Sequence, residues 1–472
     1  MSILKSRIAP IREKRLQTLV AYSGLPDVLP VELADGQLAQ RVRTFSQDTF
    51  SDILYALNVI TTIKNAAIVI HGASGCAVSR LTFCTKDKSH GKWAITNLNE
   101  RDSIMGSDTK LRSAIKQIHK LYSPEIIFVL STPIVAINND DIESVVVELK
   151  DELNVAIVPV YTDGFRSKSG VTGYDIVFYA IVKQLLPPKK VDKISGLVNL
   201  FSVSENEEEI NAVSELLQQI GLTVNLFPQY ASLENIKRLS LAEWSLSINP
   251  DESAYAGVLL ENRFHIPFLN VDIPAGGINT EVWISRIAEF TGRKEQANRW
   301  LQSEKEKRNN SPEEWSFPQQ SVFVNLPPSL AFAVSELLEE LGHEVTGLKI
   351  PYLEAAHIVR IEKIKQHKSN FSFLVGDGQI FEEENVLRKL QPGLYIGKGG
   401  DYAAAIRNGI PVIDIENLSV VGFNGVRNLA KKIRQTLSNR SFVELLAGME
   451  AQTYADGWLK KNPNWYIKQE VK

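Results

Sequence analysis

Cysteine and histidine are the side chains of this sequence best suited to chemistry, and one of each lies in a single short stretch. Residues 66–77 read AAIVIHGASGCA, with His71 after five apolar residues, then Gly72, Gly75 and Cys76. An apolar run that ends in small, flexible residues predicts a buried parallel strand followed by a tight turn. A thiolate in such a turn, close to glycine amides, has a lowered pKa and suits ligation of a metal or an iron–sulfur cluster. The alternative is that Cys76 is a small apolar residue packed behind the turn.

The other candidate motifs exclude several kinds of site. The second cysteine, Cys84, either approaches the same site as Cys76 or is a buried structural thiol. Two cysteines cannot form a zinc finger, and the sequence has neither a His-Glu-x-x-His pair nor a Gly-x-Ser-x-Gly elbow. The glycines of 397–400 either bind an anion through their amides or form a tight turn, and the spacing is not that of a phosphate-binding loop.

Composition and charge exclude further classes. Apolar residues make up 44% and charged residues 23% of the 472 residues, and the net charge is −3. A near-neutral chain with scattered Lys and Arg lacks the basic face that nucleic-acid binding requires. There is no run of about 18 apolar residues and no signal-peptide core, so we expect no contact with a membrane. Two cysteines exclude a disulfide framework, so we expect a cytoplasmic protein.

Strand and helix patterns alternate along most of the chain. We expect buried strands over 66–70, 126–130 and 155–160, with an amphipathic helix over 109–122. Strands that alternate with helices at this spacing predict a mostly parallel sheet with helices on both faces.

The same pattern restarts twice after this first domain. Strands at 198–201 and 322–326 each begin a similar unit of strand, helix and second strand, and a charged linker over 304–314 lies between the two units. The sequence therefore predicts an α/β protein with three domains. These are an N-terminal arm plus first domain over 1–190, a second domain over 191–318, and a third domain with C-terminal helices over 319–472.

The first 60 residues read as an arm rather than as a domain. They are basic at first, and a turn is expected at 22–26. Such an arm either wraps a neighbouring subunit or is a solvated tail.

The turn and several later segments resemble a known family. His71-Gly72-Ala73-Ser74-Gly75-Cys76 resembles the His-Gly-x-x-Gly-Cys signature of nitrogenase component 1 subunits and their relatives. Further segments agree in the same order within residues 60–440, at 102–107, 131–141, 164–166, 172–175, 410–411 and 422–425.

The resemblance implies three Rossmann-like domains and a homologous partner subunit, with the heterodimer usually doubled to a heterotetramer. It also implies an iron–sulfur cluster between the paired subunits and an ATP-dependent iron protein that docks over it for electron transfer. Cys76 would then be a metal ligand, and His71, Gly72 and Gly75 would belong to the cofactor-binding turn.

Departures from the family pattern affect the ligand set. A full double cluster takes three cysteines from each subunit, but here only Cys76 is in register. The earlier position falls near Ser46, and Pro133 occupies the later one. Because an iron–sulfur cube needs four ligands, Cys76 would share the cluster with a partner chain. Cys84, Ser46 and Asp48 are candidate further ligands, although oxygen is a harder donor to iron.

The ligands of a molybdenum–iron cofactor are also missing. No cysteine lies within residues 232–262, and no histidine shortly precedes Gly422. In these respects the chain resembles a β-type subunit or the β-type chain of a cofactor-assembly scaffold. Three hypotheses result: a subunit of a nitrogenase-like oxidoreductase, a scaffold for cofactor assembly, and a relative without a cluster. The loops at 163–170, 272–279 and 397–402, at predicted strand ends, are candidates for a substrate pocket.

Overall fold

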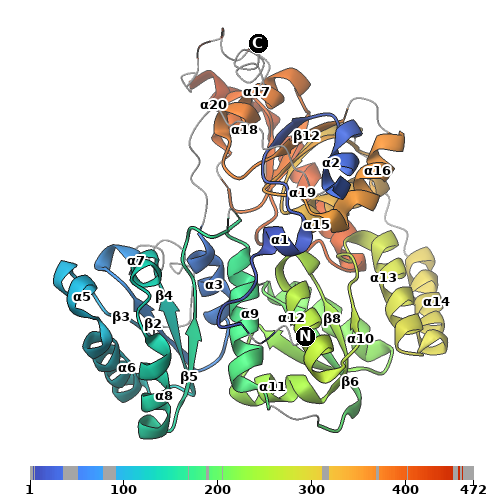
Figure 1. The fold of residues 1–472 in the computed structure, drawn as a ribbon. Coiled ribbons are helices and arrows are strands. Elements are labelled where there is room, and N and C mark those ends of the chain that lie inside the picture. Colours follow the sequence, from blue (N-terminus) through green and yellow to red (C-terminus); the bar gives the residue numbers. More distant parts are fainter. Residues whose placement is uncertain are drawn as a thin grey trace. The chain divides into compact units, whose positions relative to one another are not determined.

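The computed structural model describes residues 4, 6–35, 51–77, 92–167, 169–187, 191–204, 206–310, 318–367, 371–400, 402–449, 455, 457 and 460. The chain groups into two compact units (Figure 1). The first unit comprises Met1–Arg15, Phe50–Glu205 and Gly221–Asn270, and the second comprises Leu16–Thr49, Asn206–Ile220 and Val271–Lys472. The domain boundaries at 190 and 318 stay a prediction.

The first unit contains two four-stranded parallel sheets. The strands of the first sheet are β2 (Ala66–His71), β3 (Trp93–Ile95), β4 (Ile126–Ser131) and β5 (Ala156–Val160), in the spatial order β3-β2-β4-β5. All of β4 is buried, as expected for a central strand covered on both faces. The strand order reverses between β2 and β4, and such a switch point is where open α/β sheets bind ligands. His71 pairs with Ser131 at that end.

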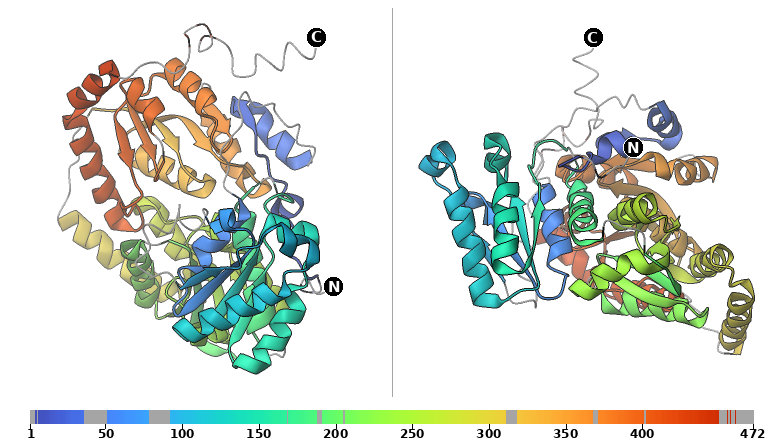
Figure 2. Two further views of the ribbon diagram at one scale, coloured as in Figure 1. Left: turned by 90° about the vertical axis from the view of Figure 1, so that its left-hand side faces the viewer. Right: turned by 60° about the horizontal axis from the view of Figure 1, so that its bottom comes forward.

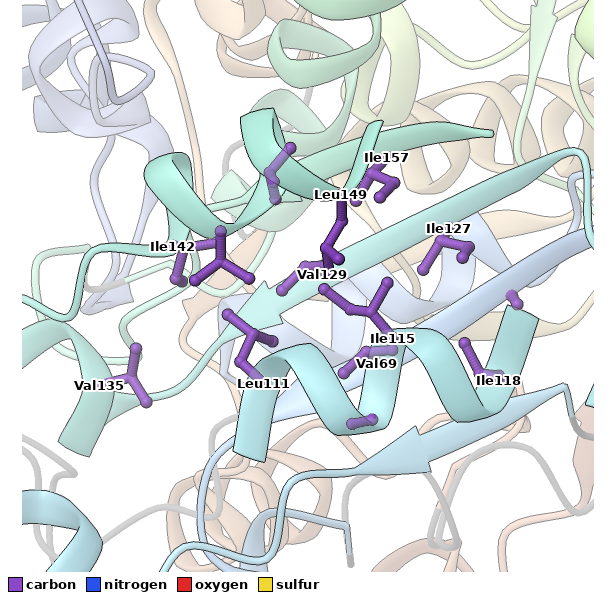
Figure 3. Close-up of a cluster of buried hydrophobic side chains, with 14 of the residues drawn as sticks. Val69, Leu111, Ile115, Ile118, Ile127, Val129, Val135, Ile142, Leu149 and Ile157 are labelled. Carbon is purple, nitrogen blue, oxygen red and sulfur yellow. The ribbon is translucent and has the colours of Figure 1, made fainter. Parts of the chain in front are cut away.

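Helices cover both faces of the first sheet. α6 (Asp108–Tyr122) and α8 (Ile142–Leu153) lie on one face, and α3 (Asp52–Ile60) and α9 (Thr172–Leu185) lie on the other (Figures 1 and 2). Figure 3 shows the core between α6, α8 and the sheet, where Leu111 and Ile115 of α6 point toward Val129. Full burial of each such side chain contributes about 1.5–3 kcal/mol. Three short helical segments follow strand ends: η2 (Ser74–Ala77), α5 (Glu100–Met105) and α7 (Pro133–Asn138).

The second sheet of this unit repeats the strand pattern of the first. Its strands are β6 (Ile194–Ser202), β7 (Thr223–Pro228), β8 (Ala242–Ser247) and β9 (Phe268–Leu269), in the order β7-β6-β8-β9. Its helical segments are α11 (Leu233–Arg238), η4 (Leu239–Leu241) and α12 (Pro250–Phe264). Because α12 packs against α9, the two sheets form one unit.

The second unit contains one six-stranded sheet. Its strands are β1 (Tyr22–Gly24), β10 (Ser321–Asn325), β11 (Glu344–Ile350), β12 (Ser372–Val375), β13 (Leu394–Gly397) and β14 (Val412–Asp414), in the order β1-β12-β11-β10-β13-β14. Every pair is parallel except β1 with β12. The five parallel strands have the order of a Rossmann-type sheet. The expected α/β fold with mostly parallel sheets is therefore confirmed.

The remaining helical segments belong to the second unit, apart from α1 (Arg12–Leu16), and α13 and α14 lie side by side among them (Figures 1 and 2). They are η1 (Pro26–Val28), α2 (Leu29–Asp35), α10 (Glu207–Gln219), α13 (Gly276–Phe290), α14 (Lys294–Asn310), α15 (Pro328–Glu340), η5 (Ala355–His357), α16 (Ile358–His367), α17 (Ile380–Leu390), α18 (Ala403–Arg407), α19 (Phe423–Ser438) and α20 (Arg440–Met449). None of the helices in the described part of the chain has both the length and the apolar character needed to span a bilayer.

Three sequence expectations are corrected here. Much of 6–35 packs against this chain itself, with Arg12 buried, so a solvated tail is wrong for this segment. The turn expected at 22–26 begins as strand β1, because its backbone satisfies the open edge of β12. The linker expected at 304–314 begins inside helix α14, and residues 311–317 lie outside the described residues.

Candidate functional site

Cys76 lies in the turn that follows β2, at the switch point of the first sheet. Its backbone N–H donates to the carbonyl oxygen of Ala73 at 2.9 Å, within the short helical segment η2. Its thiol is free and half-buried. A Cβ atom at Gly75 would meet no described atom within 4 Å, so this side of the turn is open. Cys76 is therefore not a fully buried thiol of the hydrophobic core.

Gly72 allows β2 and β4 to approach closely at their carboxyl ends. A Cβ atom at Gly72 would lie 2.4 Å from Oγ1 of Thr132, nearer than any real contact. Thr132 Oγ1 donates to the carbonyl oxygen of His71 at 2.8 Å, and the Gly72 N–H donates to Thr96 Oγ1 at 2.9 Å. The glycine is thus required by the packing of the turn against its neighbours.

His71 is fully buried below the turn and is held through both ring nitrogens. Nδ1 lies 3.1 Å from Thr96 Oγ1, and Nε2 lies 3.0 Å from Ser107 Oγ. Ser107 Oγ in turn donates to Asp140 Oδ2 at 2.5 Å. Because the serine proton is directed at the carboxylate, Nε2–H is the donor to Ser107, and Nδ1 accepts from Thr96. His71 therefore braces the turn.

The electrostatics of the site keep His71 neutral. Burial lowers its pKa from 6.5 to about 4, and the nearby carboxylates of Asp140 and Asp108 oppose that shift only in part. Nε2 lies 3.5 Å from Asp140 Oδ2, so a protonated ring would have an ion-pair partner. The cost of burying the charged ring is nevertheless the larger effect on its pKa. A neutral imidazole with both nitrogens hydrogen bonded has no lone pair left for a metal.

The loop after β5 forms the third side of the site. Asp52, the first residue of α3, accepts hydrogen bonds from the N–H groups of Asp163 and Gly164, each at 3.0 Å. Burial raises the pKa of Asp52, while these two amides lower it. A Cβ atom at Gly164 would lie 3.3 Å from Cγ of Pro133, so this loop adjoins the start of α7. The carboxyl ends of β2, β4 and β5 thus meet at one edge.

The structure brings together only part of the expected site. His71, Gly72, Gly75 and Cys76 share one turn, whereas Cys84, Ser46 and Asp48 lie outside the described residues. Across the described part of the chain, no three His, Cys, Asp or Glu side chains are grouped so that they could hold a metal ion. The roles of these residues as ligands and cofactor-binding residues stay predictions.

The backbone amides of the candidate anion loop at 397–400 already donate hydrogen bonds to residues of the same unit. The N–H of Gly399 donates to Asp414 Oδ1 at 3.1 Å, and that of Gly400 donates to the hydroxyl of Tyr402 at 3.1 Å. An anion would have to displace both partners, so the tight-turn interpretation is favoured. This loop and 272–279 belong to the second unit, and 163–170 to the first.

Comparison with known proteins decides the family. The profile described as "Nitrogenase component 1 type Oxidoreductase" matches residues 51–438. The chain belongs to this family. The component 1 signature His71–Cys76 therefore lies within the matched region.

Individual relatives of the component 1 family are distant. The chain is 22% identical over 378 residues to the nitrogenase iron-molybdenum cofactor biosynthesis protein NifE of Methanococcus maripaludis, covering 78% of this chain and 77% of that protein. It is 24% identical over 417 residues to the nitrogenase molybdenum-iron protein alpha chain of Methanothermobacter marburgensis, covering 81% and 86%. The structure of nitrogenase Cp1 at pH 6.5 shares the fold, with a TM-score of 0.73, 18% identity, and coverage of 85% and 94%. The second of these relatives is named as an alpha chain.

Sequence reasoning missed the residues that brace the turn. Thr96, Ser107, Asp140 and Asp52 lie far from Cys76 in the sequence, and no spacing rule links them to it. The one available signal was that Ser107 and Asp140 fall within or beside segments that resemble the family. Their position in those segments made Ser107 and Asp140 candidates for side chains that support the Cys76 turn.

Proposed function

We propose that the chain is a subunit of a nitrogenase-like oxidoreductase complex and shares an interfacial iron–sulfur cluster through Cys76. In this proposal a homologous subunit supplies the other ligands, and an ATP-dependent iron protein delivers electrons to the cluster. The observation that carries the proposal is the half-buried, free thiol of Cys76 beside the open face of its turn. Membership of the component 1 family supports the same role. The low cysteine content, two in 472 residues, favours a reducing cytoplasm.

The donor set fits a shared cluster and not one held by this chain alone. A cube takes four ligands, and this chain offers one thiolate in the described turn. Pro133, where the resemblance expects a cysteine, begins α7 and has no donor atom to offer. When bound, the cluster would supply one-electron redox chemistry. The residues of this chain would hold Cys76 in place, through Gly72, His71 and Thr132.

Exposed apolar side chains near the turn support docking of partner proteins there. Ile104 is 81% exposed, Met105 75%, Ile137 69% and Phe165 56%. We name these four residues the carboxyl-edge patch. α5 contacts α7, and the loop of Phe165 adjoins Pro133 of α7, so the patch lies on neighbouring elements that follow strands of the first sheet. Large apolar side chains gathered on neighbouring elements are typical of protein interaction surfaces.

A scaffold for cofactor assembly is the second candidate function. The observation that favours it is the relative NifE, named as a cofactor biosynthesis protein, together with the absence of a cysteine from 232–262. The two functions differ in turnover. A reductase subunit oxidises the reduced iron protein over many ATP-dependent cycles, whereas a scaffold transfers its metal to an acceptor and is left metal-free.

The test is anaerobic co-purification of the chain with its homologous subunit, followed by iron and sulfide analysis. We expect Cys76→Ala to lose most of the iron and the brown absorbance, because a cube that loses one of its thiolates is destabilised. Ser74→Ala, which changes an exposed residue of the same turn, is the matched control and should keep both. Unchanged iron in the Cys76→Ala complex would contradict the proposal, as would a wild-type complex without iron.

A further inference from the structure

The loop between β5 and α9 is held at both ends by carboxylates from the N-terminal part of the chain. Asp52 binds the amides of Asp163 and Gly164 at the start of the loop. Near its end, Glu13 Oε1 accepts from the N–H of Ser169 at 3.0 Å. The hydroxyl of Ser167 donates to the same carboxylate, with oxygen distances of 2.9 and 3.0 Å. The segment between these two anchors carries Phe165 of the carboxyl-edge patch.

The position of Glu13 is fixed, because the residues on both sides of it contact helix α9. Arg12 and Arg15, on either side of Glu13, both pair with Asp175, whose side chain is 1% exposed. The guanidinium of Arg15 also lies 3.9 Å from the centroid of the Tyr255 ring. Further back, the carbonyl oxygen of Ser6 accepts from the hydroxyl of Tyr179 at 2.5 Å and from Lys183 Nζ at 3.0 Å. Residues 6–15 are therefore attached at several points to the helix that follows the loop.

We infer that residues 6–15 form a strap that sets the conformation of the β5–α9 loop, with Glu13 as its positioning residue. The described loop, 163–167 and 169–170, has its own internal bonds, since Asp163 Oδ1 accepts from the N–H groups of Phe165 and Arg166. The second half has internal contacts too, since Ser167 Oγ lies 2.8 Å from the carbonyl oxygen of Ser169 and 2.7 Å from Thr172 Oγ1. Glu13 attaches this half to the strap, because Ser167 and Ser169 direct a hydroxyl and an amide at that one carboxylate.

The functional consequence rests on the proposed function. If partners dock on the carboxyl-edge patch, the strap pre-organises Phe165 for that contact. Pre-organisation lowers the entropy cost of ordering a loop on binding. Glu13 would therefore affect partner affinity without touching the partner, the cluster or Cys76.

The test compares Glu13→Ala with Glu152→Ala, which removes an exposed carboxylate from α8 of the same unit. Hydrogen exchange of peptides covering 163–170, and trypsin cleavage after Arg166, are measured on the full chain. We expect both rates to rise about tenfold or more in Glu13→Ala and to stay unchanged in Glu152→Ala, since hydrogen bonds to a charged group are the stronger ones. Ser167→Ala removes one donor to Glu13 together with its contacts to Ser169 and Thr172 and leaves Glu13 and the strap intact, so it should give a rise in the same direction.

Affinity for the homologous subunit that co-purifies with the chain is the second measurement. We expect Glu13→Ala to weaken it about threefold to tenfold while the iron content of the assembled complex is unchanged. Exchange and cleavage at wild-type rates in Glu13→Ala would overturn the strap. A loosened loop with wild-type affinity would overturn its link to docking. If the wild-type chain binds no such subunit but Glu13→Ala still loosens the loop, the proposed function fails and the strap stands.

Discussion

Two glycines in the Cys76 turn have opposite steric surroundings. An added Cβ at Gly72 would collide with Thr132, whereas one at Gly75 would meet no described atom. We therefore expect Gly72→Ala to lower the free energy of unfolding by about 1–3 kcal/mol. Gly75→Ala should change it by less than about 0.5 kcal/mol. Urea unfolding of both variants checks this, and equal losses would contradict the close approach of β2 and β4.

The buried, neutral His71 makes the stability of the protein depend on pH. Its pKa is about 4 in the folded protein and near 6.5 in an unfolded chain, so the unfolded state binds more protons between these values. This contribution is fully present above pH 6.5 and is lost as the pH falls toward 4, with about 1.4 kcal/mol gone at pH 5.5.

Urea unfolding at pH 7.5, 6.5 and 5.5 measures this loss. His71→Gln removes the titrating group, so its stability should fall less over the same range, even if the variant is less stable at pH 7.5. Parallel pH profiles for the two proteins would show that His71 is not the responsible group.

At the scale of elements, the attachment of α1 to α9 depends on one buried carboxylate. Asp175 pairs with both Arg12 and Arg15. Asp175→Asn keeps the size of the side chain but removes its charge, so we expect a loss of about 3–5 kcal/mol in the free energy of unfolding. Glu148→Gln breaks the exposed pair with Arg112 and should cost less than about 1 kcal/mol. Chemical denaturation distinguishes the two, and a small loss in Asp175→Asn would mean that the arginines are solvated.

At the level of the whole molecule, each of the three sheets has its own buried apolar core. These cores predict a fold that forms without a metal. We expect removal of iron by an anaerobic chelator to abolish the visible absorbance and to leave the far-ultraviolet circular dichroism of the chain unchanged. A loss of helical signal on chelation would mean that metal binding is coupled to folding, as in zinc fingers.

The parallel strands and the main helices were predictable because their apolar patterns repeat along the chain. The strands at 66–70, 126–130 and 155–160 were found within a residue at each end, since buried parallel strands are apolar throughout. The helix expected over 109–122 is α6, whose apolar residues recur with the helical period. The edge strand β1 was missed because it has only three residues and is fixed by pairing with β12.

The α/β class, the parallel strands and the turn that carries Cys76 after one of them could all be predicted from the sequence. These follow from local patterns, in which each residue's neighbours along the chain decide its structure. The contacts of Thr96, Ser107 and Asp140 around His71 become visible only in the folded chain. The same is true of Glu13 and Asp52, which hold a loop more than a hundred residues away. Such contacts depend on where the strands and helices meet in space. The sequence around a hydroxyl or carboxylate does not indicate which distant amide or ring it will bind.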